Sequence, residues 1–187
     1  RAGTVGFPLP GVDLRVADQE TAAEVGVGEI GVLEVRGRNV FKGYWQMPEK
    51  TKEEFRDDGF FITGDLGMDD KDGYVHIVGR AKDLIISGGL NIYPKEVEQA
   101  LDDLDDVLES AVVGVPHPDL GEGVVGIVVP EKGASLHPDE LMAAIHDRIA
   151  RFKQPKKLFV IDELHRNTMG KVQKNMLREQ FADCLNE

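Results

Sequence analysis

A lysine on a glycine-containing loop is the side chain of this sequence best suited to stabilise negative charge. The segment Asn167-Thr168-Met169-Gly170-Lys171 precedes a stretch with a helical pattern, 172–184. A compact ammonium group on such a loop can reach a neighbouring cleft and meet a developing oxyanion or a phosphate oxygen. Alternatively, Lys171 belongs with Lys174 and Arg178 to the solvated face of the helix. The segment alone does not decide between these interpretations.

Asp65 and Arg80 are of the types that bind a nucleotide. Asp65 follows Thr63-Gly64, and its carboxylate could accept hydrogen bonds from the two neighbouring hydroxyls of a ribose. Arg80 presents a rigid fork of donors to carboxylates, phosphates or sugar oxygens. Each residue also has a simpler interpretation. Asp65 could bind backbone amides in an Asx-type turn, and Arg80 could form a surface ion pair.

A charged joint and a glycine turn follow. Lys82 and Asp83 stay hydrated in either of two conformations and lie where the pattern of the chain changes, which suits a hinge. Ser87-Gly88-Gly89 follows the apolar run 84–86. Paired glycines accept positive φ and let another molecule approach the backbone, but they are equally typical of a hairpin turn.

The composition excludes several kinds of partner. The net charge of −12 disfavours attraction to nucleic acid or anionic membranes. The longest apolar run, 124–129, is far shorter than the roughly 20 residues that span a bilayer. Five scattered histidines and one cysteine, Cys184, predict no metal site. A lone cysteine fits a reducing compartment, so we expect a cytoplasmic location.

A basic island interrupts this acidity. Residues 151–157, Arg-Phe-Lys-Gln-Pro-Lys-Lys, contain four basic side chains and no acid. An island of this kind is either a solvated face or a local site for an anion.

The elements that position these residues follow two patterns and predict an α+β fold class. The first part is a small β-rich segment with alternating strands at 12–16, 32–36 and 73–79 and a short helix at 49–55. The second is a compact α+β module with one three-stranded sheet. Its expected strands are 110–116, 124–130 and 158–161, and its helices begin at Pro94, Pro138 and Val172. We expect the domains 1–81 and 82–187.

The order of these motifs resembles the C-terminal part of acyl-CoA synthetases of the adenylate-forming (AMP-binding) superfamily, and the resemblance covers nearly all of the chain. The segments 47–65 and 166–174 are most similar to malonyl-CoA synthetases. The motifs are, in order, Gly43-Tyr44-Trp45, Thr63-Gly64-Asp65, Gly79-Arg80-x-Lys82-Asp83, Gly88-Gly89-x-Asn91-Ile92-x-Pro94-x-Glu96-Val97-Glu98 and Asn167-Thr168-x-Gly170-Lys171.

The resemblance implies a two-step ligase. ATP, with Mg²⁺ in the intact enzyme, and a carboxylate such as malonate give an acyl-adenylate and pyrophosphate, and CoA then displaces AMP to form a thioester. Asp65 and Arg80 would hold the AMP ribose. Lys171 would bridge the carboxylate and the α-phosphate. Lys82 would be the hinge about which a mobile C-terminal domain, 82–187, rotates between the steps.

The resemblance also implies a CoA site. Ser87, Gly88 and Gly89 would line the pantetheine tunnel, and Phe152 would stack on the CoA adenine. Lys156, with Lys153 as an extra candidate, would meet the 3′-phosphate. Gln154 stands where some relatives have arginine, which puts that phosphate contact in doubt.

Residues 1–81 would end a large N-terminal domain as a β-barrel-like subdomain. The phosphate loop and acyl pocket of the family would lie upstream of Arg1. We therefore expect this chain alone to be inactive and to require the missing N-terminal part of its own enzyme. Two alternatives stay open. One is an adenylation domain that loads a carrier protein, and the other is a non-catalytic binding module that retained the fold.

Overall fold

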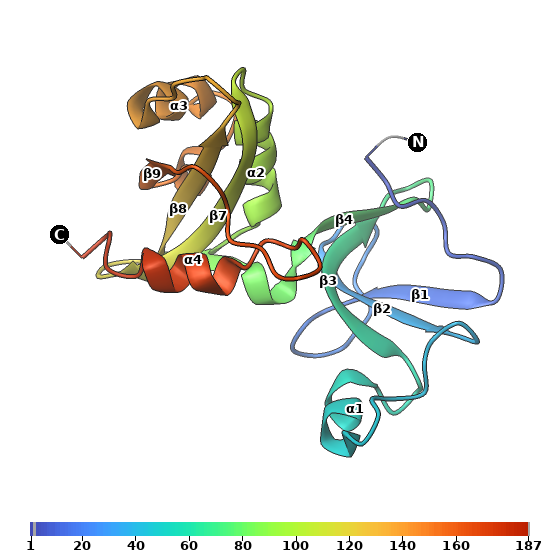
Figure 1. The fold of residues 1–187 in the computed structure, drawn as a ribbon. Helices are drawn as coiled ribbons and strands as arrows, with labels where there is room; N and C mark the ends of the chain where they lie inside the picture. The colour runs from blue at the N-terminus through green and yellow to red at the C-terminus, as the bar shows by residue number, and fades with distance from the viewer. Residues whose placement is uncertain (2, 187) are drawn as a thin grey trace. The chain divides into compact units, whose positions relative to one another are not determined.

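The computed structural model describes residue 1 and residues 3–186 of the chain and confirms the α+β class. It divides into two compact units, Arg1–Lys82 and Asp83–Glu187. Figure 1 shows the helices and strands of both. No helix among the described residues has the length and apolar character needed to cross a membrane.

The first unit is a four-stranded antiparallel sheet whose strands pair in chain order. Its members are β1 (Val12–Ala17), β2 (Gly31–Gly37), β3 (Phe61–Asp69) and β4 (Val75–Arg80), with α1 (Pro48–Glu54) between β2 and β3 in the sequence. α1 begins with Pro48, and the fixed φ of proline suits the first turn of a helix.

β3 differs from the sequence expectation. One interpretation of Thr63-Gly64-Asp65 was an Asx-type turn, but these residues lie inside a nine-residue strand. Gly64 has φ of 73°, which only glycine adopts readily. The pairing of β3 also shifts register between Leu66 and Gly67. The glycines therefore mark an irregular, bulged strand and not its end.

The second unit contains one mixed sheet with helices on both faces. Strands β6-β5-β8-β7 pair in that order, and β9 pairs parallel to β8. The elements are η1 (Ala81–Asp83), β5 (Ile85–Ser87), β6 (Leu90–Ile92), α2 (Pro94–Asp102), β7 (Val107–His117), β8 (Gly121–Pro130), α3 (Pro138–Ile145), η2 (Arg151–Lys153), β9 (Lys157–Val160) and α4 (Lys174–Gln180).

The expectation of a three-stranded sheet needs correction, because the sheet has five strands. β7, β8 and β9 are the three expected strands. β5 and β6 add a hairpin of three residues on each side, which is too short to show a period in the sequence. α4 also ends at Gln180, short of residue 184. The chain then turns, and Phe181 stacks on Phe159 with ring centroids 4.5 Å apart.

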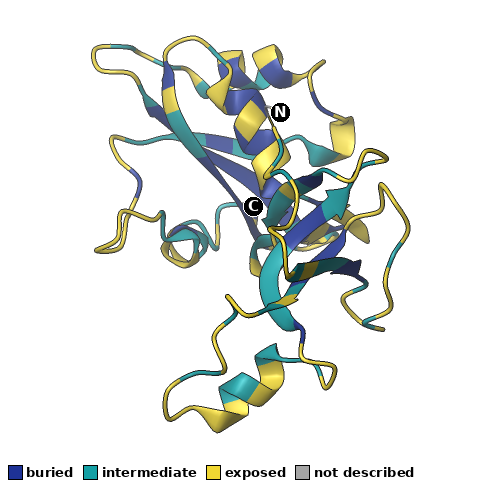
Figure 2. Ribbon diagram, turned by 90° about the vertical axis from the view of Figure 1, so that its right-hand side faces the viewer, coloured by how far each residue is buried: buried dark blue, intermediate teal, exposed yellow. Residues whose placement is uncertain are grey.

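The long strands β7 and β8 are buried on both faces. Alternate residues of β7 point to opposite cores, with Val112 in the core below α2 and α3 and Val113 in the core below α4. This explains why β8 reads as a continuous apolar run. Figure 2 shows these strands as buried and the surrounding loops as largely exposed.

Candidate functional site

β3 and β4 bring Asp65 and Arg80 together. The two residues are cross-strand partners, and they form an ion pair with 2.9 Å between Arg80 Nε and Asp65 Oδ1. Arg80 Nη1 also donates to the Thr63 carbonyl oxygen at 3.2 Å. The Asp65 and Arg80 side chains are 26% and 50% exposed. The first unit thus presents a carboxylate and a guanidinium side by side, both within reach of a ligand.

Lys171 lies on a closed turn ahead of α4. The side-chain oxygen of Asn167 accepts hydrogen bonds from the N–H groups of Met169 and Lys171, each at 3.0 Å. The Asn167 N–H donates to the Lys171 carbonyl at 2.9 Å, and Gly170, with φ of 77°, completes the turn. Lys171 is exposed. The backbone position of this lysine is therefore set by a dense local network.

The alternative that groups Lys171 with Lys174 and Arg178 on a solvated face is wrong. Lys174 forms an ion pair with Glu98 at 2.5 Å, and its side chain is only 18% exposed. Arg178 pairs with Asp83 at 2.7 Å. Lys171 also precedes the first residue of α4 by three positions. The three basic residues consequently differ in environment.

Several residues that the sequence did not single out hold the Lys171 turn. Arg166 forms an ion pair with Glu109 of β7 and donates to the Gly170 carbonyl at 2.6 Å. Glu98 of α2 forms an ion pair with Lys174, and its carboxylate also accepts a hydrogen bond from the N–H of Val112 at 3.0 Å. Glu98 occurs in the motif around Pro94, but its partner lies 76 positions away, so local sequence patterns could not identify it.

Ser87-Gly88-Gly89 forms the tip of the β5–β6 hairpin, as the simpler interpretation expected. Gly88 and Gly89 have φ of 57° and 78°, which suits a two-residue turn of the primed type. The Gly88 N–H donates to the Leu120 carbonyl at 2.9 Å. Glu122 Oε2 accepts the N–H of Ile86, also at 2.9 Å. The hairpin is thus fastened to the start of β8.

The basic island contains residues with different roles. Phe152, in η2, is 42% exposed, and Lys156 is exposed. Lys153 Nζ donates to both carboxylate oxygens of Glu96 at 2.7 Å, so much of its charge is already compensated. Gln154 Nε2 donates to the His146 carbonyl at 2.7 Å. Gln154 thus fastens its own segment to the residue that follows α3.

Lys82 is in η1, the short 3₁₀ helix that ends the first unit and begins the second. The neighbouring Asp83 is held by Arg178, as described above, while Lys82 is exposed. The change from β4 to a single 3₁₀ turn provides a short connection at this point.

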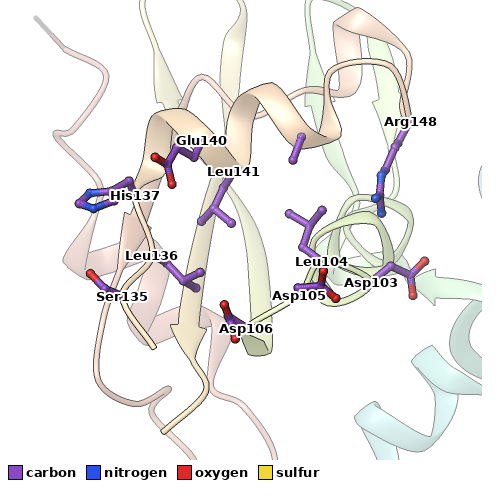
Figure 3. Close-up of a pocket in the computed structure, with 11 residues that line it drawn as sticks. Asp103, Leu104, Asp105, Asp106, Ser135, Leu136, His137, Glu140, Leu141 and Arg148 are labelled. Atoms are coloured by element: carbon purple, nitrogen blue, oxygen red, sulfur yellow. The ribbon is translucent and has the colours of Figure 1, made fainter. Parts of the chain in front are cut away.

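A separate cavity of about 480 Å³ lies in the second unit, between the residues after α2 and the start of α3. Figure 3 shows its acidic residues, among them Asp103, Asp106 and Glu140, around the apolar Leu104 and Leu141. None of the residues expected to form the site lines it. Within residues 1 and 3–186, no group of three or more His, Cys, Asp or Glu side chains could hold a metal ion.

Comparison with known families shows two matches in chain order. Residues 1–45 match the family "AMP-binding enzyme", and residues 96–171 match "AMP-binding enzyme C-terminal domain".

Individual proteins agree with these families. The ATP-bound structure of MatB from Rhodopseudomonas palustris is 58% identical, with a TM-score of 0.92, over 98% of this chain and 36% of that one. A 3-[(3aS,4S,7aS)-7a-methyl-1,5-dioxo-octahydro-1H-inden-4-yl]propanoyl:CoA ligase from Rhodococcus jostii is 45% identical over 95% of this chain and 32% of its own length. A feruloyl-CoA synthase from Amycolatopsis sp is 44% identical over 97% of this chain and 37% of its own length. The chain thus spans about a third of the length of these relatives.

Proposed function

We propose, from the premise that this chain belongs to the AMP-binding enzyme family, that it forms part of an ATP-dependent acid–CoA ligase. The intact ligase joins a carboxylate to ATP, releasing pyrophosphate, and transfers the acyl group from the adenylate to CoA with release of AMP. The observation that carries this proposal is the match of relatives named as CoA ligase or synthase to 95% and 97% of the chain.

Asp65 and Arg80 are proposed to bind the ribose of the nucleotide. The carboxylate of Asp65 accepts from the two ribose hydroxyls, and Arg80 orients it through their ion pair while keeping donors for sugar or phosphate oxygens. Half of the Arg80 side chain is exposed, so a ligand can share it without complete desolvation of the pair.

Lys171 is proposed to act in the first step. In that step the negatively charged carboxylate approaches the negatively charged α-phosphate, and a preorganised cation stabilises this charge in the transition state. The hydrogen bond from the Lys171 N–H to the Asn167 side-chain oxygen and the turn at Gly170 support this role, because they fix the backbone from which the ammonium group projects.

The second step is assigned to the hairpin tip and the basic island. Ser87, Gly88 and Gly89 are proposed to let the pantetheine arm pass close to the backbone. Phe152 is proposed to stack on the adenine of CoA, and Lys156 to meet the 3′-phosphate. Lys153 is given a supporting part in the phosphate contact, because Glu96 already neutralises it.

Residues 1–81 are proposed as the last part of a large AMP-binding domain and residues 82–187 as a mobile domain that rotates about Lys82. The phosphate loop, the acyl pocket and Mg²⁺ binding belong in this proposal to an N-terminal part that the chain needs as its partner. The chain alone is therefore expected to be inactive. A cytoplasmic location is part of the same proposal.

Malonate is the acid that we propose. The support is the resemblance of segments 47–65 and 166–174 to malonyl-CoA synthetases, together with the 58% identity to MatB. A different acceptor in the second step is the competing function. It is favoured by the amide bond synthetase McbA from Marinactinospora thermotolerans, which is 35% identical over 96% of this chain and 36% of that one, with a TM-score of 0.89.

The test is pyrophosphate release and thioester formation by the full-length protein. We expect malonate-dependent pyrophosphate release from ATP, and malonyl-CoA once CoA is added. Pyrophosphate release without a thioester would indicate a carrier-loading or amide-forming enzyme. Absence of both with a panel of short and aromatic acids would indicate a non-catalytic module.

The role of Lys171 has its own test. Replacing it with alanine removes one preorganised donor, which lowers the rate of adenylation by about 10²–10³-fold at comparable sites. Thioester formation from synthetic malonyl-adenylate and CoA should continue. Loss of both half-reactions in the Lys171→Ala enzyme would contradict a role limited to the first step.

A further inference from the structure

One helix of the second unit carries two glutamates that contact two separate candidate segments. α2 contains Glu96 and Glu98, which lie two positions apart and so project from different sides of the helix. Glu96 holds Lys153 beside Phe152. Glu98 holds Lys174, three positions after Lys171. The same helix thus contacts the segment assigned to CoA and the segment assigned to adenylation.

The ion pair between Glu98 and Lys174 is largely buried, and the Glu98 carboxylate is also held by the backbone of β7. Glu98 is 8% exposed, and the Lys174 side chain 18%. The carboxylate oxygen that receives Lys174 also accepts the N–H of Val112 in the middle of β7. The sheet therefore determines where the carboxylate lies, and the carboxylate determines where Lys174 lies.

The position of Lys174 is transmitted to Lys171 through a short, hydrogen-bonded segment. The N–H of Gln173 donates to the His165 carbonyl at 2.8 Å, and Arg166 and Val172 form an isolated bridge. On the other side of the turn, Arg166 pairs with Glu109 of β7. One end of the Lys171 turn is thus ion-paired to β7 through Arg166, and the other is ion-paired to α2 through Lys174, whose partner Glu98 is hydrogen-bonded to β7. The Lys174 end is the less exposed.

A buried ion pair is a poor way to gain stability. Desolvation of the two charges offsets much of their attraction, and well-packed neutral residues of similar size often serve as well. A function for the pair Glu98–Lys174 is therefore better sought in geometry. An ammonium group misplaced by about 1 Å from a reacting centre can lower a rate by roughly 100-fold.

We propose that Glu98 and Lys174 are positioning residues for Lys171 in adenylate formation, whereas Glu96 positions the CoA-binding segment through Lys153. This inference rests on the proposed ligase function. It adds a division of labour within α2, in which two glutamates on one helix support different half-reactions.

The test uses the full-length protein and measures the two half-reactions separately. Adenylation is followed as acid-dependent pyrophosphate release, and thioester formation is started from synthetic acyl-adenylate and CoA. We expect Glu98→Gln and Lys174→Met each to lower the adenylation rate by about 10- to 100-fold and to leave thioester formation unchanged. Glu96→Gln is the matched variant. It should raise the KM for CoA and leave adenylation unchanged.

Two further variants separate positioning from stability. The double variant Glu98→Gln/Lys174→Met has no unpaired buried charge, so its melting temperature should return toward that of the wild type while adenylation stays slow. Lys174→Arg keeps a cation that can reach Glu98 and should retain adenylation.

Recovery of adenylation together with stability in the double variant would overturn the proposal. So would a parallel fall of both half-reactions in the soluble, folded variants, or loss of adenylation in Lys174→Arg at unchanged melting temperature. A failure of the ligase proposal itself is distinguishable, because the wild-type protein would then release no pyrophosphate with any acid.

Discussion

The two compact units differ in how they are stabilised. In the second unit, buried side chains form one cluster on each face of the sheet, centred on residues such as Leu101 and Ile145 on one face and Ile127 and Leu177 on the other. In the first unit, the described buried cluster is Val16, Leu33 and Val75, with Leu14 and Val25 packed against it. Because apolar burial is the dominant favourable term in folding, the second unit has much the larger share of it.

The first unit shows the opposite feature, exposed apolar side chains and a buried charge network. Leu9 is 71% exposed and Trp45 86%. Glu34, which is fully buried, forms ion pairs with Arg15 and Arg56 at 2.7 and 2.8 Å. The second unit therefore has the apolar core expected of a unit that folds by itself, whereas the first combines a small core with a buried carboxylate that is costly to leave unpaired.

Separation of the units should give the largest effect. Residues 83–187 expressed alone should unfold cooperatively in urea, because both faces of their sheet are covered by their own helices. Residues 1–82 alone should show no cooperative transition, since few of their apolar side chains are buried. Circular dichroism during urea titration of each segment checks this. Comparable cooperative transitions in both segments would remove the proposed asymmetry.

A matched pair of isoleucines sharpens the comparison. Ile145 is fully buried in the second unit, and Ile77, in β4 of the first, is 46% exposed. Ile145→Ala should lower the free energy of unfolding by an amount in the upper half of the range of about 2–5 kcal/mol, because the substitution leaves a cavity. Ile77→Ala should change it by less than about 0.5 kcal/mol. Urea unfolding of residues 1–187 measures both, and similar losses would contradict the assignment of cores.

Glu34 tests whether charge pairing supports the first unit. Glu34→Gln should destabilise that unit by the lower end of about 3–5 kcal/mol, since Arg15 and Arg56 lose a buried partner but remain partly exposed. The NMR signals of the backbone amides of residues 1–82 report on this unit in residues 1–187. Asp13→Asn is the control, because its pair with Arg36 is largely exposed and should contribute less than about 1 kcal/mol. Equal effects would mean that burial of Glu34 is unimportant.

Acidification should have the smallest effect on the stability of the first unit, and it should have none near neutral pH. The hydrogen bond from Arg15 lowers the pKa of Asp58, and that from His76 lowers the pKa of Asp70. A carboxyl group whose pKa in the folded state lies below the unfolded value of about 3.9 stabilises the fold fully at pH values above 3.9. It is lost as the pH falls through the lower folded pKa.

The NMR signals of the backbone amides of residues 1–82, followed between pH 7 and pH 2, should therefore report loosening of the first unit only below about pH 4. Asp58→Asn should flatten this dependence. A first unit that becomes more stable on acidification from pH 4 would show that the sign is wrong.

Elements with clear periods or start signals were predictable. Pro94 and Pro138 begin α2 and α3 as expected, because proline suits the first helical turn. The strand β3 was missed because Gly64 and Gly67 interrupt its pattern, although the sheet accommodates them as irregularities. A hairpin turn at Ser87-Gly88-Gly89 was one of the two interpretations of that segment, but its membership of the sheet was missed, because three residues on each side are too few to define an alternation.

Candidate site residues could be selected from the sequence by type and motif, but their contacts could not be predicted. Lys171 and Arg80 could be selected because their motifs occur in a recognisable order. The pairs Lys153–Glu96 and Lys174–Glu98 join positions 57 and 76 apart. Their partners could not be chosen from many acidic residues without the fold.

The sequence by itself determined the class of the fold and the order of α2, β7, β8, α3, β9 and α4 in the second unit. These depend on short-range preferences: proline at helix starts, glycine at positive φ, and the alternation or run of apolar residues. Only the tertiary structure decided which charges meet. Glu98 receives both Lys174 and the N–H of Val112 because α2 packs over β7. The strength of an ion pair depends on distance and burial, and neither is written in the order of residues.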